Sequence, residues 1–169
     1  SEGLSEELTG GALGIGVPGG CYQGATREEL FRVFEFASKT KTPVYTHVRD
    51  PNLASVQEAI ANAVTTGASV HNVYLNSMAL GRINVALDMI GAAQQKGFDI
   101  TTEIYPYTAA STSLQSTLFD EGWQNVWDMD YSDIQWEETG ERLTEETFKK
   151  YRKQGGTVIL HMMKEPWIE

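Results

Sequence analysis

The stretch PVYTHVRDPNLASVQEAIANAVTTG, from Pro43 to Gly67, predicts one complete structural unit. Its first part, 43–49, is rich in β-branched and aromatic residues, which favours a strand, and the Asp-Pro-Asn at 50–52 is typical of a turn that begins a helix. Apolar residues then recur at helical spacing before the closing Gly67: Leu53, Val56, Ile60 and Ala63. A strand is therefore expected to lead through a short turn into a helix.

The same succession recurs on both sides of this unit, at intervals of roughly 25–30 residues, the size of a βα unit. Strands are expected at 12–18, 69–76 and 99–105, with helices that begin after Thr26 and near Ile83. The segment of about 108–142 has no sustained period and predicts an irregular insertion, after which Thr144 caps a short helix and 157–161 predicts a fifth strand. Alternating strands and helices imply parallel pairing with right-handed crossovers, so the expected fold class is α/β.

Composition narrows the class of protein. A chain of 169 residues with 41% hydrophobic content is expected to form one domain around one core. Its formal charge of −10 repels phosphate backbones and anionic membranes, so neither nucleic acid nor membrane is an expected partner. No apolar run approaches the roughly 20 residues of a spanning helix. The lone Cys21, in a sequence without a recognisable signal segment, predicts a reducing, cytoplasmic location.

Side chains alternate across a strand, so each expected strand can be divided into two faces. The apolar faces are Val44, Thr46 and Val48, then His71, Val73 and Leu75, then Ile100, Thr102 and Ile104. The polar faces are Tyr45, His47 and Arg49, then Asn72, Tyr74 and Asn76, then Thr101, Glu103 and Tyr105. A parallel sheet covered by helices on both sides has two apolar faces. A polar second face instead suggests a barrel lumen, whose functional groups gather at the C-terminal ends of the strands.

These polar residues each have a structural and a functional interpretation. His47 is either a metal ligand or a hydrogen-bonded structural histidine. Glu103 is a metal ligand, a general base or a buried carboxylate paired with Arg49, which is expected on the same face. His71 falls on the expected helix-facing side, which favours a structural role, and His161 has no visible partner and stays unassigned. Three tyrosines are interpreted as barrel filling rather than as acid catalysts: Tyr45, Tyr74 and Tyr105.

Five stretches together resemble the D-aminoacylase and N-acyl-D-glutamate deacylase branch of the amidohydrolase superfamily. They are GALGIGVPGG (11–20), YTHVRD (45–50), HNVYLNSMALGRINVALDMI (71–90), DITTEIYPYTAAST (99–112) and ILHMMKEPW (159–167). The resemblance is most specific in the T-H-x-R strand end and in T-T-E-x-Y-P-Y-T-A-A-S-T. It implies a partial TIM-like (β/α) barrel of about four to five parallel strands with flanking helices, a single domain over 1–169.

In this family, zinc activates a water that attacks an acyl amide, which releases a carboxylate and a D-amino acid. The histidine of the T-H-x-R strand is a metal ligand there, so the resemblance assigns that role to His47. Relatives have H-I-x-H-L-N-S on the next strand, with a metal ligand at its second His, and here Tyr74 occupies that place. A phenol must lose a proton with a pKa of about 10 before it binds zinc well. Substrate-binding roles fall by position on Arg49, Asn76, Tyr105 and Ser111, and no catalytic residue is assigned.

Other parts of the family site have no counterpart in the sequence. Relatives carry H-x-H on the first barrel strand, a ligand such as Cys on an early strand and a catalytic Asp in a segment like S-D-G. Catalytic zinc needs about three protein ligands. The resemblance thus predicts a fragment of a metal-dependent amidohydrolase that hydrolyses the linear amide of an N-acyl-D-amino acid, and the chain alone is expected to be inactive.

Two alternatives to this prediction remain open. One is a non-catalytic half-barrel that serves binding or assembly. Its open sheet edges predict cover by a second copy, as a homo-oligomer, or by missing barrel segments. The other alternative is a rearranged metal site formed by His47, Glu103 and Tyr74.

Overall fold

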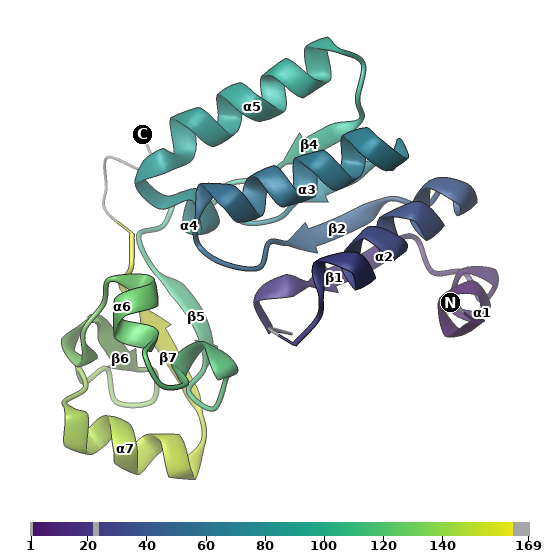
Figure 1. Ribbon diagram of the computed structural model, residues 1–169. Coiled ribbons are helices and arrows are strands. Elements are labelled where there is room, and N and C mark those ends of the chain that lie inside the picture. The colour runs from purple at the N-terminus through teal and green to yellow at the C-terminus, as the bar shows by residue number, and fades with distance from the viewer. Residues whose placement is uncertain (1, 22–23, 164–169) are drawn as a thin grey trace. The chain divides into compact units, whose positions relative to one another are not determined.

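The computed structural model describes residues 2–21 and 24–163. The chain divides into two compact units, Ser1–Ile104 and Tyr105–Glu169 (Figure 1). The end of the ILHMMKEPW stretch, residues 164–167, lies outside the described residues.

A parallel sheet of four strands, in the order β1-β2-β3-β4, organises the first unit. Its strands are β1 (Ile15–Pro18), β2 (Val44–His47), β3 (Val70–Asn72) and β4 (Ile100–Thr102). Its helices are α1 (Glu2–Thr9), η1 (Gly19–Cys21), α2 (Arg27–Thr40), α3 (Leu53–Thr66), α4 (Leu75–Ala79), η2 (Leu80–Arg82) and α5 (Ile83–Gln95). Consecutive strands are neighbours in the sheet and are joined by helices, which confirms the predicted α/β architecture.

The helices begin and end where side chains or backbone geometry satisfy unpaired backbone groups. Thr26 caps α2 by accepting a hydrogen bond from the N–H of Glu29, and the Glu29 carboxylate accepts one from the N–H of Thr26, so the predicted capping box is present. Asn52 caps α3, which ends at Gly67 with a φ of 73° in the left-handed region. Among the described helices, none has the length and apolar character needed to cross a membrane.

One face of the first sheet packs under α2, α3 and α5, which lie over it in Figure 1. Strand register aligns a row of apolar side chains on this face, each no more than 5% exposed: Ile15, Val44, Val70 and Ile100. The next row points to the opposite face, which we call the open face: Gly16, Tyr45, His71 and Thr101. The predicted contrast between an apolar and a polar face is therefore present.

The third strand is shorter than predicted. It ends at Asn72, and Tyr74 has a left-handed φ of 55° before α4 begins at Leu75. Side chains alternate between the two faces only while the backbone is extended. The apolar Leu75, which lies in a helix, therefore cannot be used to assign His71 to a face. The assignment of His71 to the helix-facing side is wrong. His71 lies on the open face, and Asn72, only 1% exposed, lies under the helices.

An antiparallel sheet of three strands, in the order β5-β7-β6, organises the second unit. Its elements are β5 (Ala110–Ser113), η3 (Thr117–Phe119), α6 (Trp123–Trp127), η4 (Tyr131–Asp133), β6 (Ile134–Trp136), α7 (Glu145–Gln154) and β7 (Thr157–Leu160). Aromatic rings from the short elements surround Phe148 of α7, with centroids 5.7, 5.5 and 5.2 Å from it: Phe119, Trp123 and Tyr131. The segment without a sequence period thus contributes to a core through contacts between short elements.

The predicted fifth strand forms as β7, but its pairing differs from the expectation. Ser111 of β5 and Gln135 of β6 both lie opposite Ile159 in antiparallel ladders. A strand after a helix is parallel to the preceding strand only when both belong to the same sheet, and β7 belongs to a different sheet. Within the described residues, the parallel sheet contains four strands.

Candidate functional site

His47 is the last residue of β2, at the C-terminal edge of the parallel sheet. Its Nδ1 atom lies 3.1 Å from the carbonyl oxygen of Val48. An N–H at Nδ1 donates to this carbonyl, which leaves the lone pair of Nε2 for a ligand. Burial lowers the pKa of His47 below its ordinary value, although the hydrogen bond to Val48 opposes this effect. The neutral imidazole, the form that binds metals, is therefore favoured.

Two glycines allow the chain after β1 to pass directly beside this histidine. A Cβ atom at Gly19 would lie 2.7 Å from the carbonyl oxygen of His47. A Cβ atom at Gly20 would lie 3.0 Å from both Nδ1 and Cε1 of the ring. The Gly-Gly pair thus permits a backbone approach that a larger residue at position 19 would block.

Tyr74 follows β3 and lies beside His47, with ring centroids 6.0 Å apart and ring planes at 66°. Its left-handed backbone is unusual for a bulky residue, and Tyr74 is 48% exposed. The two residues come from neighbouring strand ends, as the sequence predicts. They are brought together at the C-terminal edge of the sheet.

A second cluster, which the sequence analysis missed, surrounds His71 on the open face. Its Nδ1 lies 2.8 Å from the hydroxyl of Thr101, and its Nε2 lies 3.4 Å from the carboxylate of Glu103. The ring of Tyr45 lies 5.7 Å from the ring of His71, centroid to centroid. The sequence signal for this cluster was Val70, because a β-branched residue in the apolar row places the following His71 in the polar row.

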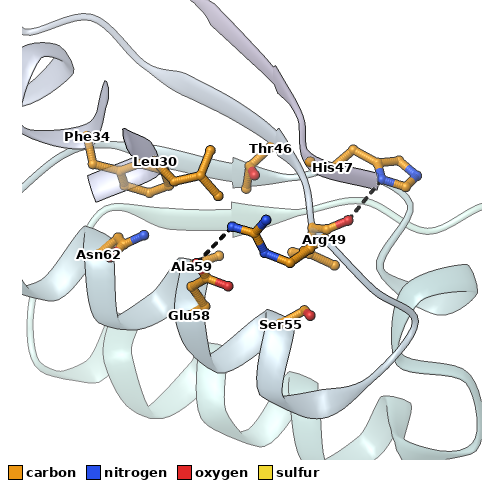
Figure 2. A pocket seen from close by; sticks show the side chains of 11 residues that line it. Leu30, Phe34, Thr46, His47, Arg49, Ser55, Glu58, Ala59 and Asn62 are labelled. Atoms are coloured by element: carbon orange, nitrogen blue, oxygen red, sulfur yellow. Dashed lines mark hydrogen bonds and ion pairs between the residues drawn. The ribbon is translucent and has the colours of Figure 1, made fainter. Parts of the chain in front are cut away.

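Arg49 does not join His47 on the open face, so that prediction is wrong. The strand ends at His47, and the guanidinium of Arg49 points toward α3, where its Nη2 lies 3.4 Å from Oε1 of Glu58. Figure 2 shows the Arg49 side chain directed toward Glu58 and the His47 ring directed elsewhere. The expected pairing of Arg49 with Glu103 is wrong as well, because Glu103 contacts His71.

The other predicted site residues are distributed over both units. Asn76 belongs to α4 and is 1% exposed. Tyr105 and Ser111 belong to the second unit, where the Tyr105 hydroxyl donates to the sulfur of Met163 at 3.6 Å and Ser111 lies in β5. The ring of His161, unassigned from sequence, lies 2.9 Å from a glutamine side chain of β6, which is a structural hydrogen bond. The substrate-binding roles of Asn76, Tyr105 and Ser111 stay predictions.

A complete zinc site does not form among the described side chains. Within residues 2–21 and 24–163, no group of three or more His, Cys, Asp or Glu side chains is placed to hold a metal ion. Catalytic zinc requires about three protein ligands, and this region offers His47 with Tyr74 beside it. Glu103 is engaged with His71, so the arrangement does not favour a site formed by His47, Tyr74 and Glu103.

Comparison with known proteins identifies the fold. No protein-family model matches the chain, and no curated protein matches it. An N-acyl-D-glutamate deacylase structure from Bordetella bronchiseptica, complexed with zinc and a phosphonate inhibitor, matches with a TM-score of 0.65 and 22% identity, over 85% of this chain and 33% of that one. A D-aminoacylase structure that defines a novel subset of amidohydrolases matches with a TM-score of 0.70 and 25% identity, over 95% and 37%.

A further D-aminoacylase structure, solved to study its binuclear metal centre, matches with a TM-score of 0.68 and 23% identity, over 95% of this chain and 37% of that one. The chain thus spans about a third of the length of the structures that it matches. Its four parallel strands and flanking helices are consistent with part of the TIM-like barrel of these amidohydrolases.

Proposed function

We propose that this chain is part of a metal-dependent amidohydrolase of the N-acyl-D-amino-acid deacylase type, in which His47 is a metal ligand. The observation that carries the proposal is the placement of His47 at the C-terminal end of a parallel strand, with Nδ1 3.1 Å from a backbone carbonyl. Metal-binding histidines commonly have their second ring nitrogen hydrogen-bonded in this way. The match to a deacylase solved with zinc supports the same assignment.

The proposal also covers substrate and location. It assigns substrate binding to Asn76, Tyr105 and Ser111, with an N-acyl-D-amino acid as the substrate. N-acyl-D-glutamate is the first compound to test, because one matching structure is an N-acyl-D-glutamate deacylase. It treats 1–169 as one partial barrel domain, and it retains the cytoplasmic location expected from the lone Cys21.

The same proposal makes the 169-residue chain inactive when it is alone. His47 supplies one nitrogen, and the phenol of Tyr74 is a poorer zinc ligand than the imidazole that relatives have in this place. When zinc is bound in a site of this type, it activates water for attack on the amide. The remaining ligands must come from outside the described residues.

The experiment compares the 169-residue chain with the same chain extended at both ends by its flanking coding sequence. Zinc content and hydrolysis of N-acetyl-D-amino acids are measured for both, and for the variants His47→Asn and His161→Asn of the extended chain. The extended protein should bind zinc and hydrolyse substrate, His47→Asn should lose both, and the structural His161→Asn should retain both. Full activity of His47→Asn, or flanking sequence without an H-x-H and a catalytic Asp segment, would contradict the proposal.

A second candidate function, a non-catalytic half-barrel that assembles with a second copy, is favoured by the sheet edges. Among the described strands, β1 pairs with β2 alone and β4 pairs with β3 alone. An apolar groove of ≈ 210 Å³ lies beside β1, lined in part by Leu4, Val17, Leu30 and Val33. Unpaired edges and uncovered apolar grooves favour association, and two four-stranded sheets supply the eight strands of a closed (β/α) barrel.

Sedimentation of the 169-residue chain tests this second candidate. Association through the groove predicts a dimer that Leu4→Glu converts to a monomer, because a carboxylate cannot be buried in an apolar contact without a partner. Val64→Glu is the matched control, since Val64 is 37% exposed on α3 and does not line the groove. A wild-type chain that stays monomeric over the whole concentration range would exclude this candidate.

A further inference from the structure

Arg49 joins three segments of the first unit that are separate in sequence. Its Nη1 atom donates to the carbonyl oxygen of Ala25 at 2.5 Å, and its Nη2 atom lies 3.4 Å from Oε1 of Glu58 in α3. Arg49 itself follows the end of β2. One side chain thus connects the end of β2 to Ala25, just before α2, and to α3.

The environment of this guanidinium makes it unsuited to a substrate on the open face. The side chains of Arg49 and Glu58 are only 15% and 14% exposed. The Nε atom of Arg49 is buried and has no hydrogen-bond partner among the described residues. A small cavity lies beside the pair. Its volume of ≈ 10 Å³ is about what a single water molecule requires. Arg49 is thus enclosed between the sheet and α3 (Figure 2).

Gly19 and Gly20, which like Ala25 lie between β1 and α2, pack against His47. A Cβ atom at Gly20 would lie 3.0 Å from the His47 ring and 3.5 Å from the carbonyl oxygen of Arg49. A Cβ atom at Gly19 would lie 2.7 Å from the carbonyl oxygen of His47 and 3.2 Å from the backbone nitrogen of Arg49. Any displacement of these glycines from the end of β2 therefore changes the wall against which the imidazole rests.

We infer that Arg49 is a positioning residue. Its contacts with Ala25 and Glu58 hold the described residues between β1 and α2, 19–20 and 24–26, against the end of β2, which fixes the orientation of the His47 ring. This role replaces the substrate-binding role that the sequence predicts for Arg49. The inference rests on the proposed function only in treating His47 as a metal ligand. The effect of Arg49 on the orientation of the His47 ring requires no metal.

Nuclear magnetic resonance of the metal-free 169-residue chain tests the inference directly. The readout is the nuclear Overhauser cross-peak between the Hα protons of Gly20 and Hε1 of His47, recorded with the urea midpoint of each variant. Arg49→Met and Glu58→Met should each reduce the cross-peak at least threefold. Arg49→Lys retains one charged donor and should fall between the wild type and Arg49→Met, because lysine lacks the planar fork of arginine.

Arg27→Met is the matched control, because the Arg27 side chain is 81% exposed and lies 3.9 Å from the same Glu58 carboxylate. It should keep the wild-type cross-peak. Should a methionine variant fail to fold, Glu58→Gln is measured in its place, with a twofold reduction expected. An unchanged cross-peak in the folded Arg49 and Glu58 variants overturns the inference. Failure of the extended chain to bind zinc would overturn the proposed function, but it would not affect the inference about Arg49.

Discussion

The Nε2 atom of His71 lies 3.4 Å from the carboxylate of Glu103, on the face of the parallel sheet opposite α2, α3 and α5. Their side chains are 23% and 46% exposed. A pair so accessible to water contributes little to folding, in contrast to the enclosed pair of Arg49 and Glu58. The open face is thus a polar surface that can carry function at little cost in stability.

Glu103→Gln is expected to lower the free energy of unfolding by less than about 1 kcal/mol, as for other exposed pairs. Glu58→Gln is the matched comparison and should cost about 2 kcal/mol or more, because it leaves the enclosed Arg49 charge with a weaker partner. Urea denaturation measures both variants. A larger loss for Glu103→Gln than for Glu58→Gln would mean that the open face is covered.

Asn72→Leu is expected to leave stability unchanged or to raise it by about 1 kcal/mol. Asn72 is 1% exposed, and neither its Oδ1 nor its Nδ2 has a hydrogen-bond partner among the described residues. Leucine has a similar shape and removes two unsatisfied buried polar atoms. Thermal or urea unfolding gives the result, and a loss above about 2 kcal/mol would show that the amide has a partner.

Gly19→Ala is expected to destabilise the chain by about 1–3 kcal/mol, because its Cβ would lie 2.7 Å from the carbonyl oxygen of His47. Gly16→Ala on β1 is the matched control, since nothing lies within 4 Å of its Cβ position. The control should be neutral or slightly stabilising through the unfolded state. Equal effects of the two substitutions on the urea midpoint would contradict the close packing at the end of β2.

The capping box of α2 predicts a dependence of stability on pH. Hydrogen bonds from the backbone N–H and the hydroxyl of Thr26 lower the pKa of the Glu29 carboxyl in the folded state. A folded-state pKa below the unfolded one contributes stability that is complete above the unfolded value, roughly 4.3, and is lost as the pH falls through the lowered value. The difference in unfolding free energy between wild type and Glu29→Gln should therefore shrink on acidification, and a constant difference would refute the assignment.

Much of the first unit was predictable because its helix caps, turns and apolar periodicity all indicate the same strands and helices. The cap at Thr26, the helix start after 50–52 and the closing Gly67 were predicted and are observed, since each depends on backbone groups within a few residues. The antiparallel pairing of β7 was not predictable from the sequence pattern. It depends on contacts between segments far apart in the chain, such as Ser111 with Ile159, for which the strand itself carries no local signal.

The site was predictable only as far as the strands are extended. His47 ends β2, as predicted, and its ring contacts the ring of Tyr74, which lies two residues after the end of β3. His71 and Arg49 were misplaced for one physical reason: alternation was continued past Asn72 and past His47, where the backbone leaves the strand. An apolar residue such as Leu75 fits the first turn of a helix as well as it fits a strand. The sequence pattern therefore did not indicate that the third strand ends at Asn72.

Zinc coordination by His47 can be observed through the ¹⁵N resonance of its Nε2 atom. The extended chain, labelled with ¹⁵N-histidine, is titrated with zinc at neutral pH. Binding should shift the Nε2 resonance of His47 in proportion to the zinc bound, while His161 stays unchanged because its ring is hydrogen-bonded within the second unit. Zinc that saturates the protein without moving the His47 resonance would exclude His47 as a zinc ligand.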